Sequence, residues 1–550
     1  MDHATKQPIY GQMMDSPLLI STIIEQAARN HANTSIVSKR TEGDIHRYTY
    51  SDLHLRSKKL AQALLALGLE QGARVGTLAW NTYRHVEIYY GVSGSGLICH
   101  TINPRLFTEQ IAYIIGHAED QVIFFDQTFL PLVESLIPLC PLVQHWICMV
   151  DENVQPKSSF ALLNYEQLIS GHKGDYDWPL LDERLASSLC YTSGTTGNPK
   201  GALYSHRSTV LHSYACALPD SLMLSAMDTI MPVVPMFHVN AWGIPYSAIL
   251  VGAQLVLPGA KLDGQSLYEL IESEHVNFSA GVPTIWAALL LYIKTNHLSF
   301  TNFKRTVIGG SACPPAMMKT FHEMGVEVIH AWGMTELSPI GTVARLRATD
   351  LKKSQDEKDK ILQMQGRVAS GIDMKIVDSD FNTLPNDGVA FGDLYVKGPW
   401  VVNQYYREER SALVNGWFPT GDVSTINPEG HMHITDRSKD VIKSGGEWIS
   451  SIDLENIASG HPDVMMSACI AIAHPKWDER PVLVVEKKPG VTKSDAELKA
   501  DILQFFEGKI AKWWTPNDVL FIDKIPLTAT GKMQKMRLRE IFKDYQLPSV

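Results

Sequence analysis

The sequence predicts an α/β protein with more than one domain, and three observations support this. A chain of 550 residues is longer than the usual single domain. From about residue 50, helical and strand-like segments alternate, which is the pattern of βαβ units. Beyond about residue 370, short strands separated by turn residues replace that alternation, and a smaller α/β unit follows Arg437.

The N-terminal region should form a mostly parallel sheet covered by helices. Apolar residues recur with helical period at 51–69, 83–92 and 109–117. Strand-like runs separate these helices, at 74–79, 97–102 and 121–125. Right-handed crossovers join such strands in parallel.

The same alternation returns further along the chain. Residues 185–191, 305–308 and 326–330 are predicted strands. Pro314 and Pro315 open the helix between the last two, where a proline removes no helical hydrogen bond.

A different pattern follows after residue 370. Residues 372–377, 391–397 and 431–435 are predicted strands between Gly, Pro, Asn and Asp turns, which indicates a small distorted barrel. The charge-rich stretch 351–360 is expected to be a solvated helix or loop. The smaller unit after Arg437 should contain a strand at 467–473, a helix at 494–510 and a strand at 519–522.

Composition excludes several classes of protein. The net charge of −10 gives no basic surface for a nucleic acid, so no nucleic-acid partner is expected. The seven cysteines are scattered and odd in number, which argues against a disulfide framework or a zinc site and for a reducing compartment. The N-terminus lacks the features of a signal peptide, and the apolar runs are too short for an integral membrane segment. We therefore expect a cytoplasmic location, with loose membrane contact left open.

The stretch from Tyr191 to Gly201 is the most informative in the chain. Hydroxyl residues and two glycines occupy residues 192–197, and Lys200 follows. Glycine lets backbone N–H groups approach an anion, hydroxyls add donors, and lysine adds a point charge, so this is a candidate phosphate loop. Asn198 and Pro199 separate Gly197 from Lys200, which differs from the contiguous Gly-Lys-Ser/Thr of common nucleotide-hydrolysing loops. The alternative is a flexible linker, and the preceding strand disfavours it.

Together with other motifs, this loop resembles the adenylate-forming superfamily of acyl-CoA synthetases, luciferases and peptide-synthetase adenylation domains. Five further signatures follow in the family's order, namely Gly309-Gly310-Ser311-Ala312, Trp332-Gly333-Met334-Thr335-Glu336, Thr420-Gly421-Asp422, 436–440, and Pro526 with Thr530-Gly531-Lys532. The resemblance covers most of the chain.

The resemblance implies a fold and a reaction. The fold is α/β, with a large N-terminal domain of two βαβ-layered subdomains plus the small distorted β-barrel, and a smaller mobile α+β C-terminal domain. It places the boundary between residues 1–437 and 438–550, with Lys439 as the hinge. It implies ATP-dependent activation of a small-molecule carboxylic acid through an acyl-adenylate, with Mg²⁺, and transfer of the acyl group to coenzyme A.

The same resemblance assigns residues to the nucleotide. Glu336, with Thr196, would hold Mg²⁺, Thr335 would donate to the α-phosphate, and Asp422 and Arg437 would hold the ribose. Read alone, Thr335-Glu336 is also a good helix start and Asp422 a common turn former. The residues expected to bind the nucleotide cofactor are Thr192, Ser193, Gly194, Thr195, Thr196, Gly197, Lys200, Gly310, Ser311, Ala312, His330, Ala331, Trp332, Gly333, Met334, Asp422, Ile434 and Arg437.

Two segments of the C-terminal unit should serve the two half-reactions. Lys532 matches the family's catalytic lysine, which bridges the carboxylate and the α-phosphate, although a lysine in such a loop is by default a solvated one. After a rotation about Lys439, Lys443 and Trp448 with Gly445 and Gly446 would face the site and admit the phosphopantetheine arm. The alternative for this second segment is a plain glycine turn.

Residues 235–242 bear on the acid. Amino-acid-activating relatives carry an aspartate here, whereas this chain has His238, included among the catalytic residues, and no acidic residue between Met231 and Leu262. Trp242 resembles the indole that gates the acyl tunnel of bacterial medium- and long-chain fatty acyl-CoA synthetases, although ordinary core packing is the alternative. The pocket should also involve Gly281, Val282 and Pro283.

The acid itself is left between two candidates. Residues 11–14, 85–91 and 99–107 resemble a subgroup that contains fatty acyl-CoA ligases and bacterial methylmercaptopropionate–CoA ligases. A medium- or long-chain fatty acid is expected first and 3-methylmercaptopropionate second. A non-catalytic acyl- or nucleotide-binding homologue is the alternative from another class, and a homodimer is the expected assembly. An oxidoreductase fares worse, since no Gly-x-Gly-x-x-Gly opens a βαβ unit.

Overall fold

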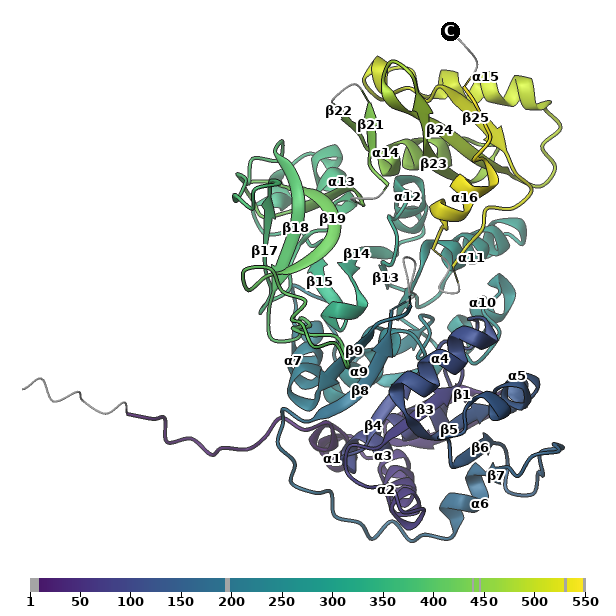
Figure 1. Cartoon of the computed structure of the whole chain (residues 1–550), viewed down its shortest axis with the longest axis vertical. Helices are drawn as coiled ribbons and strands as arrows, with labels where there is room; N and C mark the ends of the chain where they lie inside the picture. Colours follow the sequence, from purple (N-terminus) through teal and green to yellow (C-terminus); the bar gives the residue numbers. More distant parts are fainter. Residues whose placement is uncertain (1–8, 193–197, 438–439, 445–446, 529–531, 548–550) are drawn as a thin grey trace, which may run out of the picture.

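The computed structural model describes residues 9–192, 198–437, 440–444, 447–528 and 532–547. A large N-terminal domain occupies the lower and middle parts of Figure 1, and a smaller C-terminal domain lies at the top. Within the described residues, no helix is both long and apolar enough to cross a membrane.

The first sheet of the large domain has seven strands in the order β7-β6-β5-β3-β4-β8-β9. All neighbours are parallel except the last pair, β8 and β9. Its strands are β3 (Arg74–Leu78), β4 (Ile98–Thr101), β5 (Asp120–Asp126), β6 (His145–Met149), β7 (Leu163–Asn164), β8 (Ala186–Tyr191) and β9 (Gly201–Ser205). The candidate phosphate loop is therefore the connection of a β-hairpin and not a strand-to-helix turn.

The second sheet has nine strands in the order β16-β15-β14-β13-β12-β10-β11-β1-β2. Its centre is parallel, from β1 to β14, and antiparallel strands close both ends. Its strands are β1 (Ser35–Lys39), β2 (Ile45–Thr49), β10 (Thr229–Pro232), β11 (Gln254–Leu257), β12 (Phe278–Gly281), β13 (Arg305–Ile308), β14 (Glu327–Gly333), β15 (Ile340–Val343) and β16 (Arg367–Val368).

Helices cover these two sheets, as parallel strands buried on both faces require. They are α1 (Ile20–Asn30), α2 (Tyr50–Ala66), α3 (Tyr83–Gly94), α4 (Thr108–Ala118), α5 (Leu130–Leu136), α6 (Tyr165–Ser170), α7 (His206–Ala217), α8 (Val239–Trp242), α9 (Ile244–Val251), α10 (Gly264–Ser273), α11 (Pro283–Thr295), α12 (Pro315–Glu323) and α13 (Gln355–Gln363). Local sequence explains several starts: Thr49 and Asp52 form a capping box at α2, and Pro315 opens α12.

The third sheet corrects the expected barrel. Strands β17 (Asp373–Val377), β18 (Phe391–Lys397), β19 (Phe418–Ile426) and β20 (Met432–Arg437) form an antiparallel sheet in chain order. Among the described residues no pairing joins β17 to β20, so this sheet is open. Four strands enclose too narrow a space for side chains to fill, and β20 instead bridges residue Gly366 through Met432.

The C-terminal domain is an α+β unit built on a five-stranded sheet. Strands β21 (Ile442–Ser444), β22 (Glu447–Ile449), β23 (Val464–His474), β24 (Asp478–Lys487) and β25 (Asp518–Phe521) carry helices α14 (Ser451–Ser459), α15 (Asp495–Phe505) and α16 (Lys535–Ile541). This domain has its own apolar core, in which Leu454, Cys469 and Leu483 are fully buried. A separate core is what a unit needs to move as a body.

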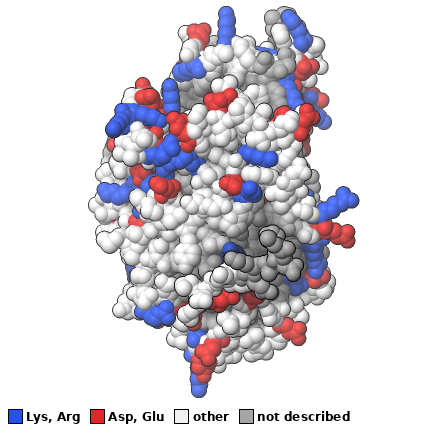
Figure 2. All heavy atoms as spheres, turned by 90° about the vertical axis from the view of Figure 1, so that its left-hand side faces the viewer, with Lys and Arg blue, Asp and Glu red and all other residues white. Residues whose placement is uncertain are grey.

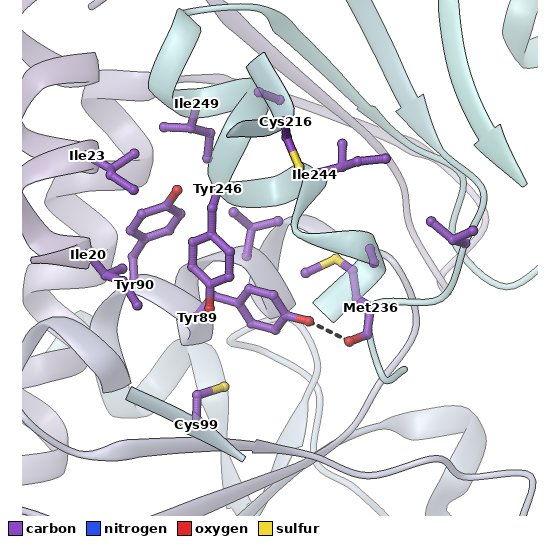
Figure 3. Packing of buried hydrophobic residues seen from close by; sticks show 14 of the residues in the cluster. Ile20, Ile23, Tyr89, Tyr90, Cys99, Cys216, Met236, Ile244, Tyr246 and Ile249 are labelled. Carbon is purple, nitrogen blue, oxygen red and sulfur yellow. Dashed lines mark hydrogen bonds between the residues drawn. The ribbon is translucent and has the colours of Figure 1, made fainter. Parts of the chain in front are cut away.

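The largest apolar core lies where the two big sheets meet. Tyr89, Tyr90 and Tyr246 pack there among isoleucines of α1 and α9, as Figure 3 shows. On the face seen in Figure 2, acidic and basic side chains are interspersed. The buried core fixes the ends of the strands that point toward the third sheet and the C-terminal domain.

Candidate active site

A cavity of about 1860 Å³ lies between the large domain, the third sheet and the C-terminal domain. Strand ends and the connections that follow them line it, from β10, β13 and β14 of the second sheet and from β19 and β20 of the third. Side chains placed at strand ends of an α/β sheet converge on one cleft. The cavity brings together residues that lie far apart in sequence, including Thr192, Glu336, Asp422 and Lys532.

The base of the candidate phosphate loop is closed by its first and last described residues. The Thr192 N–H donates to the Lys200 carbonyl at 2.9 Å, and the Lys200 N–H donates to the Thr192 hydroxyl at 3.2 Å. Tyr406 attaches the same base to the segment after β18, because its N–H donates to the Gly201 carbonyl at 2.8 Å. Residues 193–197, which carry five of the expected phosphate contacts, lie outside the described residues.

Glu336 sits almost fully buried on the wall of this cavity. Its side chain is 7% exposed, and the Tyr405 hydroxyl donates to its Oε1 at 2.7 Å. Burial raises the pKa of the Glu336 carboxyl, while the Tyr405 hydrogen bond and the Lys532 charge lower it. The Lys200 ammonium lies 4.9 Å from the centre of the Tyr405 ring. Tyr405 thus connects the candidate metal ligand to the lysine of the phosphate loop.

Thr335 and Glu336 begin a short 3₁₀ turn, Thr335–Leu337, and not the α-helix that their sequence could start. The backbone is packed tightly around them. A Cβ on Gly333 would lie 2.0 Å from the Pro339 carbonyl oxygen, so glycine is required there. The Tyr204 hydroxyl donates to the Thr335 carbonyl, and the Val402 N–H donates to the Glu336 carbonyl at 2.8 Å. These bonds hold the two side chains toward the cavity.

Asp422 is held from two sides at the end of the third sheet. The Trp332 indole N–H donates to its Oδ2 at 2.9 Å, and Arg437, its register partner on β20, places Nε 3.8 Å from its Oδ1. Burial raises the pKa of the Asp422 carboxyl, and Arg437 and Trp332 oppose that effect. A carboxylate fixed in this way keeps an oriented acceptor for hydroxyl groups of a ligand.

Lys532 reaches this cluster from the C-terminal domain. Gly310 has φ of +80°, and a Cβ built on it would lie 3.6 Å from the Lys532 Cε. The Lys532 side chain therefore runs along the Gly309–Gly310 turn. The pKa of Lys532 is lowered to about 8, because burial and the charge of Arg437 outweigh the opposing charges of Asp422 and Glu336. The lysine therefore lies among charges of both signs, at the junction of the candidate nucleotide and acid sites.

The remaining nucleotide residues expected from the sequence also line the cavity, with defined partners. His330 is 2% exposed and its Nδ1 lies 3.0 Å from the Gln363 carbonyl, while burial lowers its pKa to about 4. The Ile434 N–H donates to the Gln365 side chain at 2.7 Å. The lining also includes Ser311, Ala312, Ala331 and Met334.

The acid side of the cavity is formed around an unusual turn. Val239, Asn240, Ala241 and Trp242 all have positive φ, between +46° and +57°, and Gly243 follows at +72°. Left-handed backbone costs about 1–2 kcal/mol for each non-glycine residue, so this turn must be held by its surroundings. Trp242 lines the cavity from this turn, and a Cβ on Gly309 would lie 3.3 Å from its ring.

Part of the cavity lining consists of core side chains of the large domain, and we call this part the apolar branch. Five side chains that line the cavity are at most 6% exposed and belong to the main apolar core, namely Cys216, Leu222, Val234, Val307 and Ile340. His238 lines the cavity near them, and burial, reinforced by the charge of Lys532, lowers its pKa to about 3. His238 is therefore a neutral imidazole at physiological pH, which suits an uncharged substrate tail.

Several expected site residues are not brought into the cavity. Gly281 lies outside its lining, and a Cβ there would meet the buried indole of Trp286 at 2.7 Å, so the glycine serves core packing. Val282 and Pro283, its neighbours, do line the cavity. Lys443 is exposed on β21 and is not part of the lining. Lys439, Gly445 and Gly446 lie outside the described residues, as does the Trp448 side chain.

Sequence reasoning missed Tyr405, Asn240 and the apolar branch. Tyr405 contacts a partner 69 positions away, and Asn240 a partner 52 positions away, so local pattern could not connect them. The paired tyrosines at 405 and 406 and the asparagine inside an apolar run were the available signals.

Comparison with known proteins gives two family matches. The model of the AMP-binding enzyme matches residues 24–406, and that of the AMP-binding enzyme C-terminal domain matches residues 453–532. A 3-methylmercaptopropionyl-CoA ligase of Ruegeria lacuscaerulensis is 52% identical, covering 97% of this chain and 99% of the relative. A medium-chain-fatty-acid–CoA ligase of Ectopseudomonas oleovorans is 50% identical, covering 98% of each chain.

Among solved structures, an anthranilate–CoA ligase in complex with anthranoyl-AMP has a TM-score of 0.86 at 25% sequence identity. The match covers 96% of this chain and 98% of that one. Both comparisons extend over the large domain and the C-terminal domain together.

Proposed function

The chain belongs to the AMP-binding enzyme family, and on that premise we propose that it activates an acid with an apolar, uncharged tail, a medium- or long-chain fatty acid first. It is an ATP-dependent acid–thiol ligase that joins a carboxylic acid to coenzyme A and releases AMP and pyrophosphate.

The apolar branch of the cavity lining carries this proposal. Cys216, Leu222, Val234, Val307 and Ile340 line it without offering a charged group, and His238 beside them is neutral. Burying a methylene chain against such a wall gains about 0.8 kcal/mol for each CH₂ group. A charged or strongly polar tail would instead be stripped of water without a partner.

A second candidate has a specific observation in its favour. The 52% identical relative is named for 3-methylmercaptopropionate, an acid with a short thioether tail. A thioether is itself apolar and polarisable, so the same wall would accept it. The two candidates differ in tail length, which the acid panel below distinguishes.

The first half-reaction follows from the cluster around Lys532. The substrate carboxylate oxygen attacks the α-phosphorus of ATP, the bond to the bridging oxygen breaks, and pyrophosphate leaves. The Lys532 Cε lies 3.6 Å from the position that a Cβ on Gly310 would take. The ammonium at the end of this side chain would neutralise charge that develops between the two reactants. Asp422 with Arg437 would hold the ribose, and Thr335 would donate to the α-phosphate.

The donor set at Glu336 fits a magnesium ion, because a buried carboxylate is a hard oxygen ligand and Tyr405 occupies one face of it. When bound there, Mg²⁺ supplies charge neutralisation to the phosphates. Thr196, the other expected ligand, lies outside the described residues.

The second half-reaction would use another orientation of the C-terminal domain. The thiol of coenzyme A attacks the acyl carbon and AMP leaves. We place the domain boundary between residues 437 and 438 and the hinge at Lys439, so that a rotation brings Lys443, Gly445, Gly446 and Trp448 to the cavity. Lys443 is exposed and outside the cavity lining, whereas Lys532 lines the cavity. This supports such a rotation, because the domain has to turn before Lys443 can reach the cavity.

The proposal is tested by AMP and acyl-CoA formation across a panel of acids, from acetate to palmitate, with 3-methylmercaptopropionate included. A kcat/KM optimum at medium or long chain length supports the fatty acid. An optimum at the thioether acid replaces it with the second candidate. If no acid produces AMP, the result favours a non-catalytic acyl- or nucleotide-binding protein instead.

Trp242 gives the matching mutational test. Trp242→Ala removes an indole from the cavity lining, so we expect the range of accepted tail lengths to broaden. The acid panel measures this directly. An unchanged profile would assign Trp242 to core packing alone.

We also propose a homodimer and a cytoplasmic location. The N-terminal arm exposes Ile9, Tyr10, Met13 and Met14, each at least 82% exposed, and it extends away from the body in Figure 1. Such apolar side chains gain by packing on a second copy. The seven cysteines are all free and buried, as expected in a reducing compartment. Sedimentation with and without residues 9–14 tests the dimer.

A further inference from the structure

The left-handed turn at residues 239–243 lies between the two substrate sites. It follows β10 and precedes α9, and its last non-glycine residue, Trp242, lines the cavity. Its neighbour in space is β8, which ends at Tyr191 immediately before the phosphate loop. Side chains that join the turn to β8 therefore set the position of the acid relative to the phosphates.

Asn240 makes that connection. It is 4% exposed, and its Nδ2 donates to the Ser188 hydroxyl of β8 at 3.1 Å. Its Oδ1 accepts two longer contacts of 3.4 Å, from the Thr101 hydroxyl at the end of β4 and from the Cys190 thiol of β8. One amide side chain thus contacts two neighbouring strands of the first sheet from a turn that belongs to the second.

The segment before the turn is fixed separately. The Asn81 side chain donates to the Pro232 and Val234 carbonyls, at 2.8 and 2.9 Å, and accepts from the Met236 N–H at 2.7 Å. The Tyr89 hydroxyl donates to the Met236 carbonyl, as the dashed line in Figure 3 shows. The chain therefore enters the turn from a fixed point, and Asn240 restrains the part beyond it.

We propose that Asn240 is a positioning residue that fixes the left-handed turn to the phosphate-loop strand and thereby sets the depth of the acyl pocket. Asparagine is among the few residues other than glycine that adopt left-handed backbone readily, and its amide offers both donors and an acceptor. The inference rests on the proposed function, because it assigns the turn to acid binding.

The backbone geometry supports a role beyond packing. Four successive non-glycine residues in the left-handed region persist only where contacts over-determine them, and such outliers gather at ligand sites. If these contacts are lost, the turn can relax toward ordinary backbone and carry Trp242 with it. Strand β8 would stay in place, because it pairs with β4 and β9 on its two edges.

The experiment compares Asn240→Ala, Ser188→Ala and the double variant on the acid panel, with Ser93→Ala as the matched control. The Ser93 hydroxyl donates to the Ser187 carbonyl at 2.8 Å, so its loss removes a buried hydrogen bond to the same strand at the neighbouring residue. Steady-state kinetics give KM for the acid and KM for ATP separately.

We expect each of Asn240→Ala and Ser188→Ala to raise KM for the preferred acid about tenfold and to broaden the tail-length profile. KM for ATP should stay close to the wild-type value. The double variant should be no worse than Asn240→Ala, because both changes break one connection. Ser93→Ala should keep the wild-type profile.

A wild-type profile in Asn240→Ala, or losses that add in the double variant, would overturn the proposal. If Asn240→Ala does not fold, Ser188→Ala alone decides, because it leaves the turn sequence intact. A wild-type enzyme that activates no acid at all would instead refute the proposed function, so the two failures are distinguishable.

Discussion

Lys532 is a cation that titrates near physiological pH inside the cleft. Burial lowers its pKa to about 8, so the ammonium form predominates below that pH and the neutral amine above it. Only the ammonium can neutralise charge between a carboxylate and a phosphate. We therefore expect kcat/KM for adenylation to fall as pH rises through about 8, measured as pyrophosphate release.

Lys532→Arg serves as the control for this pH profile. A guanidinium stays protonated at any pH an enzyme tolerates, so the alkaline fall should vanish from whatever activity remains. A wild-type profile that stays flat well into the alkaline range would show that the Lys532 charge does not limit adenylation.

Tyr405 is predicted to hold Glu336 in place. Tyr405→Phe removes the hydroxyl that donates to the Glu336 carboxylate but keeps the ring beside Lys200. A hydrogen bond to a charged group contributes about 1.5–3 kcal/mol, so kcat/KM for MgATP should fall about tenfold or more. Steady-state kinetics at varied MgATP measure this change.

Tyr406→Phe is the matched control, because the Tyr406 hydroxyl donates to the Ala118 carbonyl at 3.5 Å and interacts with Arg407, and neither partner is Glu336. Equal effects of the two substitutions would contradict a specific role for Tyr405.

At this scale the sequence could identify residues but not their partners. Motif chemistry, read through the family resemblance, named Glu336, Asp422 and Lys532, and the cavity contains all three. The indole of Trp332 that holds Asp422 lies 90 positions away from it, and periodicity carries no information on such pairs. Gly281, expected in the acid pocket, lies outside the cavity lining, and nothing in the local sequence indicated that Trp286 occupies the space beside it.

At the scale of the elements, the left-handed backbone of the turn at residues 239–243 restricts which residues can occupy it. Gly243 has φ of +72°, and a Cβ there would lie 2.7 Å from the His212 ring. Gly243→Ala should lower the free energy of unfolding by about 2 kcal/mol or more, since backbone strain and a clash add. Denaturant unfolding of the variant measures this loss.

Gly416→Ala isolates the strain. Its φ is +78° and open space surrounds its Cβ position, so it should cost only the left-handed penalty. If Gly243→Ala lowers the free energy of unfolding no more than Gly416→Ala does, the contact with His212 is absent or easily relieved.

Regular elements were largely predictable, and irregular ones were not. Strands β13 and β18 lie where apolar runs between turn signals indicated, and α2, α3 and α4 begin and end within a few residues of their periodic segments. Periodicity does not distinguish a left-handed turn from helix, so α8 had no signal. The expected barrel failed because closure depends on the pairing of edge strands, which strand patterns do not encode.

At the scale of the whole molecule, one orientation of the C-terminal domain is present. Lys532 lines the cavity, whereas Lys443 lies exposed on β21 outside it. Family resemblance placed both lysines at one site, and the composition around residues 438–439 gave no sign of a hinge. Under the proposed mechanism this arrangement would serve the first half-reaction, and the second would follow a rotation of the domain.

The measurement that tests the account most directly separates the two half-reactions in Lys532→Ala. Lys524→Ala is the control, because this lysine is exposed in the same segment. Adenylation is followed as acid-dependent pyrophosphate release, and thioester formation as acyl-CoA produced from supplied acyl-adenylate and coenzyme A.

We predict that Lys532→Ala slows adenylation by about 10²-fold or more and leaves thioester formation near the wild-type rate, while Lys524→Ala changes neither. Equal losses in both half-reactions would contradict the account, because they would place Lys532 in the cleft throughout and leave no need for a second orientation.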